Sequence, residues 1–415
     1  MNIIRRNYYL DQLTKSRGNG LIKIVCGIRR CGKSFLLFRL FRNLLLETGI
    51  EEDHIISIQL DDLANEEFLN PHRLLSHIKE HITDDKQYYI LLDEIQLTEN
   101  FTAVLNSLTH IDNVDVYVTG SNSRFLSSDI ATEFRGRGEV ILLHPLSFSE
   151  FHSVREGNLD EEWEQYIRYG GLPLVAFLED DRKKVEYLQT LYRTLYLKDI
   201  IERNKIRKAD ELDKLSQIIA SSIGSPCNPS KLANTFRSAG AGALSVNTIS
   251  TFLDYLQDAF VVEKALRYDI KGKKYISTLP KYYFSDTGIR NAVIGFRQQE
   301  ESHLMENIVY NELRGRGFMV DVGAMESRSS DGNTRNYLEV DFVADLGSRR
   351  CYIQSALAVP DSDKMNQETA SLKRIPDNFK KALIVKSRTK PWYNEDGILI
   401  LGLYDFLLDR NSLEY

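Results

Sequence analysis

The sequence has no apolar run long enough to span a membrane, and its first residues lack the hydrophobic core of a signal peptide. Cysteine is scarce, with four residues in a chain of 415, and their positions do not match the spacing of metal ligands. An excess of basic residues is also missing, because the formal net charge is −6. These absences favour a reduced, cytoplasmic protein with no membrane partner. The chain length predicts two to three domains, since one hydrophobic core rarely serves so many residues.

One motif near the start of the chain has a clear chemical meaning. Gly27, Gly32, Lys33 and Ser34 complete the pattern G-x-x-x-x-G-K-[ST] between a short apolar strand, residues 21–26, and a predicted helix, residues 34–41. The glycines let successive backbone N–H groups point at phosphate oxygens, the lysine brings a charge to the β- and γ-phosphates, and the serine offers its hydroxyl to Mg²⁺. The predicted nucleotide-binding residues are Gly27, Ile28, Arg29, Arg30, Cys31, Gly32, Lys33, Ser34 and Phe35. The alternative is a glycine-rich turn in an ordinary α/β domain.

An acid pair about sixty residues later supplies the second half of this predicted site. After a helix predicted at 66–83, the segment 88–94 reads YYILLDE, a buried strand that ends in Asp93 and Glu94. Asp93 is predicted to hold Mg²⁺, and Glu94 to orient or deprotonate the attacking water. Strand-end carboxylates are common caps, so this interpretation depends on the preceding phosphate loop. We therefore expect ATP and Mg²⁺ as the ligands.

Three further groups are candidates for the same site. A strand at 114–119 is predicted to lie between the two motif strands, which would put Ser121, or else Asn122, beside the γ-phosphate; a simple turn is the alternative. Arg135 and Arg137 precede a last strand at 140–143, where they are either fingers that reach a neighbouring subunit or solvated surface residues. Tyr9 either stacks on adenine or packs in the core.

These segments resemble the AAA+ superfamily and, more narrowly, prokaryotic AAA+ ATPases that share four motifs. The motifs here are Thr119-Gly120-Ser121, Arg135-Gly136-Arg137, PLSFSEF at 145–151 and YGGLP at 169–173. The resemblance implies an α/β fold class: a P-loop AAA+ parallel sheet with a helical lid, then a winged-helix domain and an α/β nuclease-like C-terminal domain. We expect the ATPase core at 1–148, the lid at 149–208, the winged helix-turn-helix at 209–297 and the PD-(D/E)XK nuclease-like domain at 298–415.

The middle domain is the predicted DNA-binding part. An apolar stripe on a helix that begins near Ser245 leaves polar residues on the outer face of the expected recognition helix. Basic residues dominate between Lys264 and Lys281, in the expected two-stranded wing. The candidate DNA contacts are Asn247, Thr248, Thr251, Lys271, Lys273 and Lys274. The alternative is a helix-turn-helix that docks a protein partner.

The C-terminal domain lacks part of what a nuclease of the resembled fold requires. Glu306 lies on its first helix and Asp341 supplies the first strand acid, but the second acid is replaced by Gln354, and Ala356 stands where lysine is needed. We expect a degenerate, inactive nuclease site. Lys364 or Lys373 would have to compensate from the next helix for activity to survive, and the basic stretch 373–390 leaves residual nucleic-acid binding open.

The main hypothesis is an ATP-hydrolysing AAA+ protein that forms a homo-oligomeric ring, most simply a hexamer, and acts as a motor on DNA. Branched DNA such as a Holliday junction follows only from fold-level analogy. The first alternative is an ATP-dependent switch that exposes the downstream domains to a protein partner. The second is a metal-dependent nuclease licensed by ATP.

Overall fold

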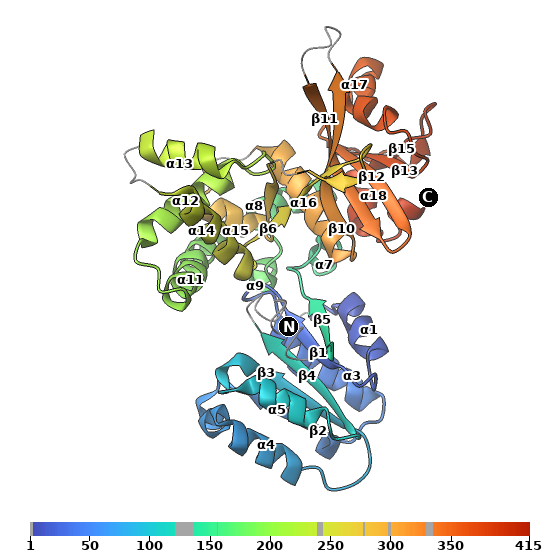
Figure 1. Ribbon diagram of the computed structural model, residues 1–415. Coiled ribbons are helices and arrows are strands. Elements are labelled where there is room, and N and C mark those ends of the chain that lie inside the picture. The colour runs from blue at the N-terminus through green and yellow to red at the C-terminus, as the bar shows by residue number, and fades with distance from the viewer. Residues whose placement is uncertain are drawn as a thin grey trace. The chain divides into compact units, whose positions relative to one another are not determined.

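The computed structural model describes residues 3–120, 136–155, 157–238, 244–276, 279–297, 300–328 and 335–415 (Figure 1). Its chain contacts divide it into two compact units. The N-terminal unit comprises Met1–Pro145 with Asp258–Phe260, and the C-terminal unit comprises Leu146–Gln257 with Val261–Tyr415. The predicted lid, middle and nuclease-like parts fall almost wholly within the C-terminal unit, and the finer four-part division remains a prediction.

The N-terminal unit is built on a parallel sheet of five described strands in the order β2-β3-β4-β1-β5. Strand β4 lies between β3 and β1, as the sequence predicts, so the two motif strands share one neighbour. Helices cover both faces of this sheet (Figure 1). The strands are β1 (Ile22–Cys26), β2 (Ile55–Gln59), β3 (Tyr88–Asp93), β4 (Val114–Gly120) and β5 (Gly138–Leu142). The helical elements are α1 (Asn7–Lys15), α2 (Lys33–Phe35), η1 (Leu36–Phe41), α3 (Arg42–Glu47), η2 (Glu52–His54), η3 (Leu63–Leu69), α4 (Pro71–Glu80), η4 (Ile95–Leu97) and α5 (Phe101–Leu108).

Two predicted helices of this unit differ from the structure. The helix after the phosphate loop continues through α2, η1 and α3 to Glu47, beyond the predicted end at Phe41. The helix predicted at 66–83 is interrupted, because Asn70 accepts hydrogen bonds from the N–H groups of His72 and Arg73 and starts a new helix with Pro71 in its first turn. A short 3₁₀ element, η3, precedes that cap. Asparagine followed by proline therefore sets the boundary that hydrophobic periodicity alone missed.

The core of this unit also contains a buried ion pair. Lys23 on β1 donates to Asp115 on β4, and both side chains are almost inaccessible to solvent. Asp115 accepts two more hydrogen bonds, from the Tyr117 hydroxyl at 2.8 Å and from the Gly18 N–H at 3.0 Å. The single charge that the first strand carries is thus neutralised within the sheet, as a buried ammonium requires.

The C-terminal unit begins with helices and ends in a mixed sheet. The helices are α7 (Phe148–His152), α8 (Leu159–Tyr169), α9 (Pro173–Phe177), α10 (Asp181–Leu191), η6 (Tyr192–Leu197), α11 (Lys198–Arg203), α12 (Ala209–Ser221), α13 (Pro229–Ser238), α14 (Val246–Asp258), α15 (Thr287–Val293), α16 (Glu301–Gly315), α17 (Ser362–Lys373), α18 (Leu403–Leu408) and η7 (Ser412–Glu414). The strands are β6 (Val262–Ala265), β7 (Arg267–Asp269), β8 (Lys274–Tyr275), β9 (Lys281–Phe284), β10 (Met319–Arg328), β11 (Arg335–Leu346), β12 (Arg349–Ala356), β13 (Lys380–Val385), β14 (Trp392–Tyr393) and β15 (Leu399–Gly402).

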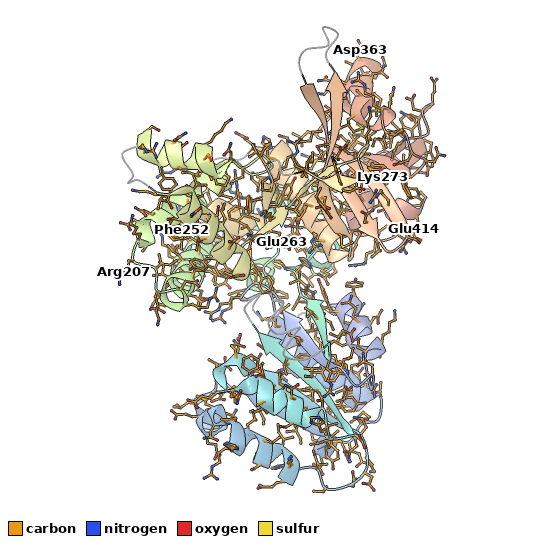
Figure 2. The ribbon with its side chains drawn as sticks, in the orientation of Figure 1. Arg207, Phe252, Glu263, Lys273, Asp363 and Glu414 are labelled. Atoms are coloured by element: carbon orange, nitrogen blue, oxygen red, sulfur yellow. The ribbon has the colours of Figure 1, made fainter. Side chains whose placement is uncertain are left out.

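The predicted wing is divided between two sheets. Strands β6 and β9 pair antiparallel, close to the pairing that the sequence predicts. Strands β7 and β8, however, extend the large sheet of order β14-β15-β13-β12-β11-β10-β7-β8, because β7 pairs in parallel with β10. Figure 2 shows Lys273, in the turn of this hairpin, beside the C-terminal sheet and away from Phe252 of α14. Because β7 pairs with β10, the turn that carries Lys273 lies at the C-terminal sheet and not beside the helices.

A buried carboxylate joins the helical parts of this unit. Asp286, the N-cap of α15, accepts hydrogen bonds from the N–H groups of Gly171 at 2.7 Å and Ile289 at 2.9 Å. Gly170 has a φ of 75°, and a Cβ atom there would lie 2.2 Å from Asp286 Oδ1. The YGGLP segment therefore needs its glycines to approach this carboxylate.

Candidate nucleotide site

The phosphate loop connects β1 to α2 in the N-terminal unit. Its backbone bends through left-handed residues, with φ of 68° at Arg30 and 103° at Gly32. A Cβ atom at Gly27 would lie 2.2 Å from the Leu143 carbonyl oxygen, so this position accepts only glycine. Cys31 lies buried within the loop, and burial raises the pKa of its thiol. The loop is therefore built from backbone, as an anion cradle requires.

Lys33 lies inside this loop. Its Nζ atom donates to the carbonyl oxygens of Gly27 at 3.0 Å and Ile28 at 3.2 Å, and the side chain is buried. A buried ammonium that contacts only neutral carbonyls has no counter-charge from these contacts. An anion in the loop would supply that counter-charge.

The acid pair lies at the end of β3, within reach of the loop. Asp93 is almost fully buried and accepts a hydrogen bond from the hydroxyl of Thr119. Burial raises the pKa of the Asp93 carboxyl above its ordinary value, and the nearby hydroxyls of Thr119 and Ser34 oppose that shift. The structure thus places Ser34 near Asp93, so the two predicted metal ligands lie in one site.

Glu94 follows Asp93 in an unusual backbone conformation. Its φ is 48°, in the left-handed region that non-glycine residues rarely adopt, and its N–H donates to Thr119 Oγ1 at 2.9 Å. Gln96 Nε2 donates to the Glu94 carboxylate. Gln96 Oε1 is buried and has no hydrogen-bond partner within the described part of the chain, so it is available to a water molecule beside Glu94.

The donor set fits Mg²⁺ bound together with a nucleotide. A serine hydroxyl and one carboxylate are hard oxygen ligands, and Mg²⁺ in such sites takes its remaining ligands from phosphate and water. Among the described residues, no group of three or more His, Cys, Asp or Glu side chains is arranged to hold a metal ion.

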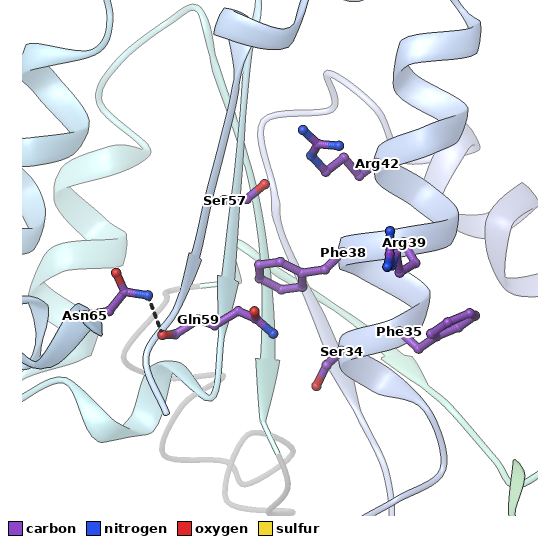
Figure 3. Close-up of a pocket in the computed structure, with 8 residues that line it drawn as sticks. All are labelled: Ser34, Phe35, Phe38, Arg39, Arg42, Ser57, Gln59 and Asn65. Carbon is purple, nitrogen blue, oxygen red and sulfur yellow. Dashed lines mark hydrogen bonds between the residues drawn. The ribbon is translucent and has the colours of Figure 1, made fainter. Parts of the chain in front are cut away.

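A cavity of about 530 Å³ opens beside Ser34 (Figure 3). It runs along the helix that follows the phosphate loop and faces strand β2, with Ser34 at one end and Arg42 at the other. Aromatic, cationic and polar side chains line it: Ser34, Phe35, Phe38, Arg39, Arg42, Ser57, Gln59 and Asn65. Asn65 Nδ2 donates to the Gln59 carbonyl at 2.9 Å. Only Ser34 and Phe35 of this lining were predicted from the sequence.

Of the predicted site residues of the N-terminal unit other than 27–35 and the acid pair, Tyr9 is buried, Arg137 is exposed and the rest lie outside the described part of the chain. Tyr9 is buried, accepts a hydrogen bond from the His144 N–H at 3.2 Å and lies under the Arg6 guanidinium, which agrees with the packing alternative. Arg137 is exposed and donates to Thr109 Oγ1 at 3.3 Å. Ser121, Asn122 and Arg135 lie outside the described residues.

The candidate DNA contacts form two separate groups in the C-terminal unit. On α14, the Thr248 hydroxyl bonds to the Ser245 cap and the Thr251 hydroxyl donates to the Asn247 carbonyl, so both serve the helix itself. Lys271, Lys273 and Lys274 are exposed, and their ammonium groups have no ion pair with any residue in the described ranges. The two groups belong to different elements and do not make one recognition surface.

The predicted degenerate nuclease residues are brought together. Gln354 Nε2 donates to Asp341 Oδ1 at 3.0 Å, and burial, together with the nearby Glu306 charge, raises the pKa of Asp341. The proposed compensating lysines are absent from this cluster, because Lys364 pairs with Glu368 and Lys373 with Asp396.

Most of the basic stretch 373–390 is also occupied by contacts inside the unit. Lys381 donates to the Ile375 carbonyl, Lys380 to the Leu413 carbonyl, Lys386 to Glu301 and Arg388 to Asp160. These residues therefore make a weaker nucleic-acid surface than their number in the sequence indicates.

Sequence reasoning missed two participants. Thr119 was noted only as part of a motif, although its hydroxyl bridges Asp93 and the Glu94 N–H. Lys281 was counted among the wing cations, but it is buried and pairs with Glu306 and Glu339. A signal for Thr119 was its position at the end of the strand between the two motif strands, whereas Lys281 gave no local signal.

Two family models match the chain. One, described as "AAA domain", matches residues 19–152, and another, described as "Domain of unknown function (DUF8612)", matches residues 160–300. No described helix is both long and apolar enough to cross a membrane.

Two relatives match most of the chain, one described as "Uncharacterized protein" and the other as "Uncharacterized protein MJ1544". One, from Haemophilus influenzae, is 34% identical over 415 residues, covering 98% of this chain and 99% of the relative. The other, from Methanocaldococcus jannaschii, is 27% identical over 392 residues, covering 91% of this chain and 83% of the relative.

Solved structures resemble the chain only remotely. Cdc6p from Pyrobaculum aerophilum is 13% identical with a TM-score of 0.31, covering 74% of this chain and 94% of that one. The ORC1 protein of Aeropyrum pernix, solved in complex with DNA, is 14% identical with a TM-score of 0.28, covering 70% and 92%.

Proposed function

Because the chain belongs to the same family as the Haemophilus influenzae protein and carries an AAA domain in its N-terminal unit, we propose that it binds ATP with Mg²⁺ and hydrolyses it. The observations that support this most strongly are that the Ser34 hydroxyl lies near the Asp93 carboxylate and that the buried Lys33 ammonium donates to two backbone carbonyls of the phosphate loop. Lys33 and Ser34 begin α2, whereas Asp93 ends β3, so these groups are far apart along the chain.

The proposed roles follow from the chemistry of each group. Lys33 pairs with the β- and γ-phosphates, and Mg²⁺, when bound by Ser34 and Asp93, stabilises their negative charge. Glu94 accepts a proton from the attacking water as its oxygen bonds to the γ-phosphorus, and Gln96 Oε1 accepts the water's other hydrogen. The bond from the γ-phosphorus to the β–γ bridging oxygen breaks, giving ADP and inorganic phosphate.

The test is the substitution Lys33→Ala. We expect ATP turnover to fall at least about 10²-fold, because a preorganised cation is lost from the charge that develops in the transition state. Phosphate release measures ATP turnover, and binding of a fluorescent ATP analogue measures nucleotide affinity. Lys79→Ala, an exposed lysine on α4 of the same unit, is the matched control and should leave both unchanged. Wild-type turnover in Lys33→Ala would contradict the proposal.

We also propose that the protein acts as a ring, most simply a hexamer, in which arginines complete the neighbouring site. Arg137 supports this role because it is exposed directly before β5, an edge strand among the described strands of the sheet. Arg135 as a second finger and Ser121 or Asn122 as the γ-phosphate sensor belong to the same proposal.

DNA is the proposed macromolecular partner. The three exposed lysines of the β7–β8 turn support it, because phosphate contacts provide most of the affinity of such proteins for nucleic acid. The outer face of α14 adds less support, since two of its hydroxyls bond within the helix. Branched DNA and a motor activity rest on analogy. A protein-binding switch remains the alternative in which nucleotide binding, rather than turnover, is the signal.

A further inference from the structure

We propose that the buried ammonium group of Lys281 supplies the positive charge that a nuclease-like centre takes from a metal ion. Lys281 and the carboxylates around it then form a closed structural cluster, which we call the latch. The latch comprises Lys281, Glu306, Glu339 and Asp341, with Gln354 and Ser355 as hydrogen-bond donors. It lies wholly in the C-terminal unit.

Lys281 is held by two carboxylates. Its Nζ atom lies 2.9 Å from Glu306 Oε1 and 2.7 Å from Glu339 Oε1, and only 4% of its side chain is exposed. The Tyr283 hydroxyl also donates to Glu306 Oε1, at 2.6 Å. Burial opposes the charged form of Lys281, but the charges of Glu306, Glu339 and Asp341 together raise its pKa above the ordinary value. The ammonium is thus the cation at the centre of the acids.

Asp341 directs both its oxygens at donors on β12. Oδ2 accepts from the Ser355 N–H at 2.9 Å and from the Ser355 hydroxyl at 2.8 Å, and Oδ1 accepts from Gln354 Nε2. Gln354 Oε1 in turn accepts from the Asp341 N–H at 3.3 Å. A carboxylate at position 354 would repel Asp341 instead of donating to it. The amide is therefore a fitted partner of this aspartate, and the cluster does not fit a metal.

The other side of Glu306 is covered by the turn after α12. A Cβ atom at Gly224 would lie 3.1 Å from Glu306 Oε2 and 3.2 Å from His303 Nδ1. The backbone of Gly224 thus lies against the acid that a metal would need. In addition, no group of three metal-holding side chains occurs among the described residues here or elsewhere.

The latch has a mechanical consequence. Lys281 and Tyr283 lie on β9, whose last residue, Phe284, exchanges two hydrogen bonds of 2.7 Å with the side chain of Asn307 on α16. Glu306 lies next to Asn307 on that helix, and Asp341 lies on β11 of the large sheet. The ion pairs therefore fasten the β6–β9 pair and α16 to the sheet.

The first test is Lys281→Met, which keeps the length and removes the charge. We expect the melting temperature of the C-terminal unit to fall by about 10 °C, because a buried carboxylate cluster loses its cation. Lys281→Met combined with Glu306→Gln, which also removes one acid, should recover much of that loss. Lys364→Met is the matched control, since Lys364 makes an ion pair in the same unit outside the latch, and it should shift the melting temperature by no more than about 2 °C.

The second test measures metal binding and DNA cleavage instead of stability. Wild-type protein without nucleotide is titrated with Mn²⁺ and followed by electron paramagnetic resonance, beside Asp341→Asn. We expect Asp341→Asn to leave the wild-type spectrum unchanged, and neither protein to cleave supercoiled DNA. Mn²⁺ binding or cleavage that Asp341→Asn abolishes would overturn the proposal, as would a Lys281→Met variant that melts like the wild type.

Discussion

At the scale of single residues, two buried lysines show how surroundings decide a role. Lys33 contacts backbone carbonyls in a loop built for an anion, whereas Lys281 contacts carboxylates that already neutralise it. The first is therefore available to a phosphate and the second is not. A third buried charge, Asp286, depends almost entirely on backbone N–H groups.

The Asp286 carboxyl should make stability depend on pH. Burial raises its pKa from 3.8 to about 6, and its backbone hydrogen bonds only partly oppose this. The folded state therefore binds a proton that the unfolded state has lost between these values, so stability falls by about 3 kcal/mol as the pH rises through that window. The Asp286→Asn variant should be less stable than the wild type, and its free energy of unfolding should not fall as the pH rises through that window. Urea unfolding at pH 4.5 and 7 measures both.

The control for that measurement is Asp254→Asn. Asp254 is exposed on α14, so its replacement should keep the wild-type dependence on pH. If Asp286→Asn and the wild type lose stability in parallel between the two pH values, the carboxyl does not titrate in that window.

At the scale of elements, the β7–β8 hairpin differs from the predicted wing in its pairing. Its turn carries the exposed lysines, but its pairing with β10 makes it an edge of the C-terminal sheet instead of a wing of α14. Hydrophobic pattern and basic composition predicted strands and a turn here. They did not predict the partner strand, because β-pairing between distant segments depends on tertiary packing.

The hairpin predicts a specific loss of DNA binding. Replacing Lys271, Lys273 and Lys274 by alanine should weaken duplex binding about equally for all sequences and lower the slope of log affinity against log salt by nearly three. Fluorescence anisotropy at several salt concentrations measures both. The comparison is the double variant Asn247→Ala with Thr251→Ala. A larger loss of DNA affinity in that variant would place the DNA interface on α14.

At the scale of the whole molecule, the open question is assembly. Arg137 is exposed and directly precedes β5, an edge strand among the described strands of the N-terminal sheet. The family match and the local geometry explain how one chain would bind nucleotide. Hydrolysis at the usual rate would need the neighbour's arginine if the ring proposal is right.

Arg137→Ala distinguishes ring from monomer chemistry. If Arg137 acts in a neighbour's site, the substitution should lower ATP turnover by about 10³-fold while nucleotide binding is retained. Native mass spectrometry with ATP should show the same oligomer for both proteins. A monomeric wild type whose turnover is insensitive to Arg137→Ala would end the ring proposal.

The phosphate loop, the acid pair and the order of the motif strands followed from the sequence by itself, because each depends on adjacent residues whose conformation and chemistry are local. The break at Asn70 and the bridge made by Thr119 were present in the sequence but were not recognised. Only the tertiary structure decided that Lys281 is buried and pairs with Glu306 and Glu339, which lie far from it along the chain. The physical reason is that a charge takes its role from what surrounds it after folding, and strand pairing brings those surroundings together.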